Sequence, residues 1–102
     1  MAEYILQILR SQLMVMWSWG FNSPTRLSNN RGLAFKVQGF KYQGWVEVIY
    51  KEGLDTFTVI LKQTGMKVED VYFDELVNVI DSLVERTEDY EKRVNEEYGF
   101  TA

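Results

Sequence analysis

Residues 33–62 decide the fold, and they read LAFKVQGFKYQGWVEVIYKEGLDTFTVILK. Apolar and polar residues alternate there in three runs, separated by short segments that contain glycine. Because successive side chains of a strand point to opposite faces of a sheet, this alternation predicts three strands. The segments 39–44 and 51–55 are short enough for hairpin turns, so we expect an antiparallel meander. The predicted inner face holds Leu33, Phe35, Val37, Val46, Val48, Tyr50, Phe57, Val59 and Leu61.

Helical patterns flank these strands on both sides. Apolar residues at helical spacing predict a helix over residues 3–17, although 14–19 are equally compatible with an extended segment. Residues 75–98 form the stronger pattern, with Asp74 as the expected N-cap and Gly99 just beyond the end. We expect this second helix to cover the inner face of the sheet. The apolar stripes are Ile5, Ile8, Leu9, Leu13, Met16 and Trp17 in the first helix and Leu76, Val77, Ile80, Leu83 and Val84 in the second.

The predicted class is therefore a single α+β domain spanning residues 1–102. Its expected order is an N-terminal helix, a three- to four-stranded antiparallel meander sheet, and a long C-terminal amphipathic helix packed on one sheet face. Residues 66–72 are the weaker candidate for a fourth strand.

Composition excludes several kinds of chemistry. The chain has 102 residues, of which 46% are hydrophobic and 25% charged, and it contains neither cysteine nor histidine. Thiol nucleophiles, catalytic triads and the usual zinc sites all need one of these two residues. The acids Glu47, Glu52 and Asp55 could form a pair for acid–base work, but acids beside a hairpin turn are ordinary surface residues. We therefore expect no catalytic residue, no metal and no cofactor, and a non-enzymatic protein.

The sequence predicts neither a membrane-spanning helix nor a secretory signal. No run approaches the about 20 apolar residues that a spanning helix needs. The N-terminus carries Glu3 where a secretory signal has positive charge. We expect a cytoplasmic protein without a membrane partner.

The outer face of the predicted sheet is not purely polar. Trp45, Ile49 and Ile60 lie there beside Lys36. One possibility is that this apolar patch binds a partner. The other is that residues 20–32, a long connection between the first helix and the sheet, fold over Trp45 and bury it under Phe21 or Leu27. A short strand or helical turn inside residues 20–32 is also compatible with the sequence.

Charge is distributed unevenly along the chain. Residues 1–68 carry eight basic and four acidic side chains, a net charge of +4, whereas residues 69–102 carry three basic and eleven acidic ones, a net charge of −8. The basic and aromatic region 10–45 allows nucleic-acid binding as an alternative. A second alternative is that the acidic helix docks on a basic partner as an inhibitor. The cations of the first alternative are Arg10, Arg26, Arg31, Lys36 and Lys41.

The C-terminal helix is expected to extend beyond the sheet. About 24 residues of helix span about 36 Å, whereas a strand of about seven residues spans about 23 Å. Tyr90, Val94 and Tyr98 follow helical spacing on the overhang. We expect an interaction module of unknown pathway that forms a homo-oligomer or binds another protein. Its candidate contact residues are Trp45, Ile49, Ile60, Arg26, Arg31, Lys36, Tyr90, Val94 and Tyr98.

Five short motifs resemble a family of small uncharacterised bacterial proteins that accompany mobile genetic elements. The motifs are Met-Trp-Ser-Trp-Gly at 16–20, Phe-Lys-Val-x-Gly at 35–39, Gly-Trp-Val at 44–46, Glu-Gly-x-Asp at 52–55 and Val-Tyr-Phe-Asp-Glu-Leu at 71–76. The resemblance covers most of the chain, and it implies no activity, ligand or site residue.

Overall fold

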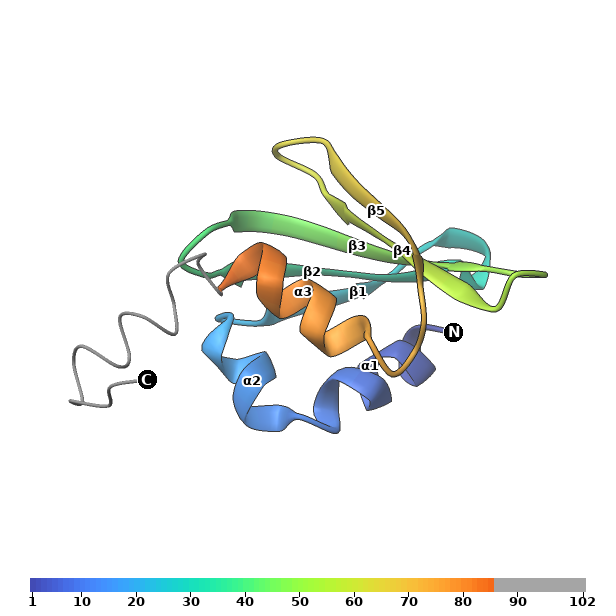
Figure 1. Ribbon diagram of the computed structural model, residues 1–102, viewed down its shortest axis with the longest axis horizontal. Coiled ribbons are helices and arrows are strands. Elements are labelled where there is room, and N and C mark those ends of the chain that lie inside the picture. Colours follow the sequence, from blue (N-terminus) through green and yellow to red (C-terminus); the bar gives the residue numbers. More distant parts are fainter. Residues whose placement is uncertain (86–102) are drawn as a thin grey trace, which may run out of the picture.

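In the computed structural model, which describes residues 1–85, three α-helices lie on one side of a five-stranded antiparallel sheet (Figure 1). The strands follow one another across the sheet in chain order, so the predicted meander and the α+β class are confirmed. The sheet has five strands rather than three or four. The elements are α1 (Ala2–Arg10), α2 (Leu13–Ser18), β1 (Asn22–Arg26), a 3-10 turn (Ser28–Asn30), β2 (Gly32–Gln38), β3 (Gln43–Lys51), β4 (Thr56–Leu61), β5 (Met66–Val71) and α3 (Leu76–Val84).

The inner face of the sheet is the one that the alternation predicted. Leu33 pairs with Val48, and Val48 pairs with Val59, so one row of core side chains crosses three strands. Eight of the nine predicted side chains are buried, and the ninth, Tyr50, is half-buried at the edge of the core. The predicted fourth strand, residues 66–72, is confirmed as β5.

The predicted helix over residues 3–17 is wrong in one respect, because it is two helices. The backbone leaves helical geometry at Gln12, where φ is −128° and ψ is 66°. After this break α2 buries Met16 in the core shared with α1, while Leu13 and Trp17 point outward instead of extending the buried stripe. Residues 14–18 are helical, which decides between the two forms that the sequence allowed.

The long connection at residues 20–32 contains an edge strand. Strand β1 pairs with β2 through Thr25 and Arg26, and a short 3-10 turn follows it. Phe21 does not cover Trp45, because its ring packs against Phe35, with 4.8 Å between ring centroids, on the helix-covered face. Edge pairing satisfies the backbone of this segment, whereas a loop laid across the sheet would leave its polar groups unpaired.

Helix α3 covers the sheet with Leu76, Val77, Ile80 and Val84. Asp74 is not its N-cap, in contrast to the prediction. The N-cap is Glu75, whose amide donates to the carbonyl of Tyr72 at 3.0 Å, and no side chain caps the helix. A turn closed by the backbone thus replaces the side-chain cap. The predicted extension of this helix to residue 98 lies outside the described residues.

The turn between β2 and β3 contacts the far end of α3. The amide nitrogens of Lys41 and Tyr42 lie 2.8 and 3.3 Å from the carbonyl oxygen of Val84, and the Lys41 ammonium donates to Ser82 O at 2.6 Å. Gly39 is needed at this crossing, because a Cβ atom there would overlap the Val84 carbonyl. Gly39 thus belongs to a hairpin turn, as the sequence indicated, whereas Gly44 lies at the start of β3 and pairs with Val37.

Candidate interaction surfaces

One face of the sheet has no helix over it in the described part of the chain (Figure 1). We call this surface the open face. Its cross-strand pairs include Lys36 with Trp45, Glu47 with Ile60, and Ile49 with Thr58. The predicted contact residues Trp45, Ile49, Ile60 and Lys36 therefore share one surface. The side chains of the open face are Ala34, Lys36, Trp45, Glu47, Ile49, Lys51, Thr56, Thr58, Ile60, Lys62, Lys67 and Glu69.

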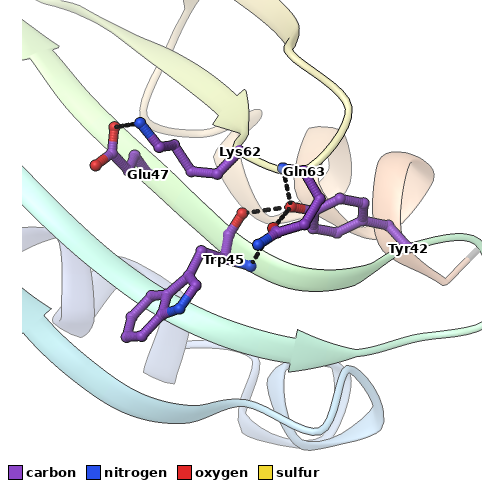
Figure 2. A network of polar contacts seen from close by, with 5 residues as sticks. All are labelled: Tyr42, Trp45, Glu47, Lys62 and Gln63. Atoms are coloured by element: carbon purple, nitrogen blue, oxygen red, sulfur yellow. Dashed lines mark hydrogen bonds and ion pairs between the residues drawn. The ribbon is translucent and has the colours of Figure 1, made fainter.

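A polar network holds the backbone of Trp45 (Figure 2). The Tyr42 hydroxyl lies 2.6 Å from the carbonyl oxygen of Trp45 and 2.5 Å from Gln63 Oε1, and its single hydrogen can serve one of them at a time. The backbone amide of Trp45 donates to Gln63 Oε1 at 2.8 Å, and the backbone amide of Gln63 donates to the Tyr42 hydroxyl at 3.1 Å. Figure 2 shows the indole ring extending away from these bonds. The network therefore positions the tryptophan.

Sequence reasoning missed Tyr42 and Gln63 as positioning residues. Each lies in a turn, and the turns at residues 39–42 and 62–65 are far apart in the chain. Gly44 is the one residue nearby that could have indicated this contact. Its φ of 142° favours glycine, and the Gln63 side chain occupies the space where a Cβ atom would be. The contact between the two turns arises only when β3 and β4 pair in their observed register.

Tryptophan and lysine lie side by side on the open face. The Lys36 ammonium is 5.7 Å from the centroid of the Trp45 ring, within the range of a cation–π contact. On the other side of Trp45, its carbonyl accepts a backbone bond from Lys62, whose ammonium lies 3.8 Å from Glu47 Oε1. Trp45 is therefore flanked by two lysines.

Two threonines of β4 are buried on this face without a hydrogen-bond partner for their hydroxyl groups among residues 1–85. Thr58 is only 1% exposed and lies at the centre of the sheet, opposite Ile49. The sequence placed Thr58 on a partly polar face, but neighbouring side chains close over it. A buried hydroxyl without a partner costs free energy, so these positions are locally destabilising.

Helix α2 carries a second apolar surface, which sequence reasoning assigned to the core. Leu13 is 40% exposed, Met14 77% and Trp17 62%, and the helix contains no charged residue. We call these three side chains the α2 patch. It arises because the break at Gln12 turns α2 so that Met16 points inward. Large apolar side chains exposed together are a common mark of a protein-binding site.

The cations of the sequence-predicted basic region do not form one stripe. Arg26 pairs with Glu3 of α1, on the helix-covered side, and Lys41 bonds to the end of α3. Lys36 lies on the open face, whereas Arg31 is exposed in the turn before β2. The structure therefore separates the cations that the sequence brings close together in the chain.

The acids considered for catalysis have different partners. Glu47 approaches Lys62 on the open face, whereas Asp55 accepts a hydrogen bond from the Tyr50 hydroxyl at 2.7 Å. This bond, together with the nearby negative charge, raises the pKa of Tyr50 above its usual value. The two carboxylates are thus drawn to different partners rather than paired with each other.

The remaining predicted contact residues, Tyr90, Val94 and Tyr98, lie outside the described residues. Within residues 1–85, no helix is long and apolar enough to cross a membrane. Comparisons with family models, curated proteins and solved structures found no match to this chain.

Proposed function

We propose that this chain is a non-enzymatic protein-interaction module that associates with a second copy of itself through the α2 patch. One observation carries the proposal: Leu13, Met14 and Trp17 are exposed together on a helix that has no charge. Tryptophan and methionine are enriched at the centres of protein interfaces, and tryptophan is among the residues that contribute most to binding energy.

An uncharged surface suits a second copy because two identical patches can meet around a two-fold axis without charge repulsion. The patch is small, however, and contacts well below about 1,200 Å² of total buried area are of the weak class. We therefore expect a dimer that forms at about micromolar concentration, rather than an obligate one.

Sedimentation velocity of the full-length chain tests this proposal. The natural protein should show a concentration-dependent shift from monomer to dimer, and Met14→Ser should keep it monomeric over the same range. Leu54→Ser is the matched control, because Leu54 is an exposed apolar residue in the turn between β3 and β4. A natural protein that stays monomeric, or a loss of dimer in the Leu54 variant as large as in the Met14 variant, would refute self-association through α2.

Nucleic-acid binding by the region 10–45 is the second candidate. It has lysine and tryptophan together at Lys36 and Trp45 in its favour, because cations and stacking rings hold single strands. This candidate predicts that the protein shifts a single-stranded nucleic acid in a gel, and that the shift weakens with added salt and in the Lys36→Glu variant. The other alternative, that the acidic helix docks on a basic partner as an inhibitor, stays a prediction. A binding measurement with a basic protein would test it.

A further inference from the structure

The charges of the described chain separate between the two sides of the sheet. The open face carries four lysines and two glutamates, a net charge of +2. Residues 1–20 and 72–85, which form the helical layer, carry five acids and one arginine, and Arg26 and Lys41 also contact this layer, so the net charge of that side is −2. The charge difference along the chain thus becomes a difference across the sheet. The acids of the helical layer are Glu3, Asp74, Glu75, Asp81 and Glu85.

Apolar and basic side chains are interleaved on the open face. Trp45 lies between Lys36 and Lys62, and Ile49 and Ile60 lie further along β3 and β4, with Glu47 between Trp45 and Ile49 and opposite Ile60. Within residues 1–85, neither Lys36 nor Lys51 lies within ion-pair distance of a carboxylate. Trp45, Ile49 and Ile60 are half-buried, so the surface offers the exposed part of each together with ammonium groups that have no acidic partner there.

This charge disfavours a second copy as the occupant. Two open faces brought together would bury a net charge of +2 against another of +2, and like charges oppose association. Nucleic acid also fits poorly, because stacking needs several rings and Trp45 is the single aromatic side chain among those of the open face.

The two described edges of the sheet oppose the addition of a partner strand, which argues for contact across the face. Strand β1 contains Pro24, which has no amide hydrogen, and Ser23 with a φ of 56°. Strand β5 carries Lys67 and Glu69 and has Asp70 at a φ of 58°. Charges and irregular backbone of this kind block strand addition.

We propose that the open face binds an acidic segment of another protein that also carries aliphatic side chains. The aliphatic groups contact Trp45, Ile49 and Ile60, one carboxylate pairs with Lys36, and another competes with Glu47 for Lys62, whose ammonium lies 3.8 Å from Glu47 Oε1. The inference adds a second binding surface to the proposed function. The α2 patch belongs to the helical layer on the other side of the sheet, so the two surfaces can be tested separately (Figure 1).

Selection from a random peptide library displayed on phage tests the inference with the full-length chain as bait. The selected peptides should contain more Asp and Glu than Lys and Arg, together with Leu, Ile or Val. One such peptide is then synthesised and titrated by calorimetry. Lys36→Glu and Lys62→Glu should each weaken its binding by about tenfold, since each change replaces an attraction with a repulsion.

Arg10→Glu is the matched control, because it makes the same change of net charge on α1 in the helical layer. It should alter the affinity by less than about twofold, as a distant charge is screened by salt. Neutral or basic selected peptides, or equal weakening by Arg10→Glu and Lys36→Glu, would overturn the inference. Loss of peptide binding in Met14→Ser would overturn it too, because the peptide would then occupy the α2 patch.

Two further measurements separate the possible failures. An oligothymidylate that displaces the peptide and binds more tightly would assign the open face to nucleic acid instead and overturn the inference. Sedimentation of Lys36→Glu should show the same dimer as the natural chain, because α2 is unchanged. A dimer without acidic-peptide binding would refute the open-face inference alone, and peptide binding by a strict monomer would refute self-association alone.

Discussion

Thr58→Val should stabilise the isolated protein. The Thr58 side chain is 1% exposed, and its hydroxyl has no hydrogen-bond partner among the described residues. In the unfolded chain the same hydroxyl bonds to water, so folding loses that bond without replacement. Valine has nearly the same shape, keeps the β-branched preference for a strand, and removes the unpaired group.

The magnitude follows from the two groups that are exchanged. Burying a hydroxyl without a partner costs about 1–3 kcal/mol, and replacement by an apolar group of the same shape can recover part of this cost. We expect the free energy of unfolding to rise by about 1 kcal/mol. For a domain of this size that change raises the melting temperature by about 4–8 °C.

Urea denaturation and calorimetry of the full-length protein measure the effect. Thr25→Val serves as the control, because Thr25 is exposed in β1 and its hydroxyl donates to Ser23 O at 3.1 Å. That variant should leave the stability unchanged or slightly lower. If Thr58→Val is no more stable than the natural protein, then the Thr58 hydroxyl is satisfied in solution and the reasoning fails.

Three further predictions concern the turns and the sheet edge. Tyr42→Phe should lower the free energy of unfolding by about 1–2 kcal/mol, measured with urea, because the buried hydrogen bonds of its hydroxyl are lost. Gly39→Ala should lower it by about 1–3 kcal/mol, because the new methyl group forces the turn away from Val84; a cost below about 0.5 kcal/mol would contradict this crossing. The pKa of Tyr50, measured by NMR titration, should lie above 10.0 and should fall toward 10.0 in the Asp55→Gly variant. Glycine is chosen because Asp55 has a φ of 56°, which glycine adopts without strain. Since the raised pKa favours the protonated phenol in the folded state, this contribution to stability is complete below pH 10.0 and is lost as the pH rises through the folded pKa.

Much of the sheet could be predicted because its pattern is local. In residues 33–62 each strand shows by its own alternation which side chains share a face, and eight of the nine predicted inner side chains are buried. The apolar stripe of α3 followed from helical spacing in the same way. Such periodicities depend on backbone geometry alone, so neighbouring residues are enough to reveal them.

The break between α1 and α2 had no local signal. Residues 10–13 contain neither glycine nor proline, and the apolar spacing runs through them without interruption. The helix breaks where Met16 can reach the core beside α1 and α3, and this same turn exposes Trp17. The α2 patch, on which the proposed function depends, could therefore not be predicted from the sequence pattern.

The sequence by itself determined that Trp45, Ile49 and Ile60 lie together on the face opposite the core. Only the tertiary structure decided that β1 pairs with β2 at the edge of the sheet. It also decided that Tyr42 and Gln63 form a hydrogen bond beside the Trp45 backbone, and that Thr58 is buried. The physical reason is the range of the interactions. Alternation sets the direction of each side chain from its neighbours, whereas what covers a face depends on contacts between segments that are distant in the chain.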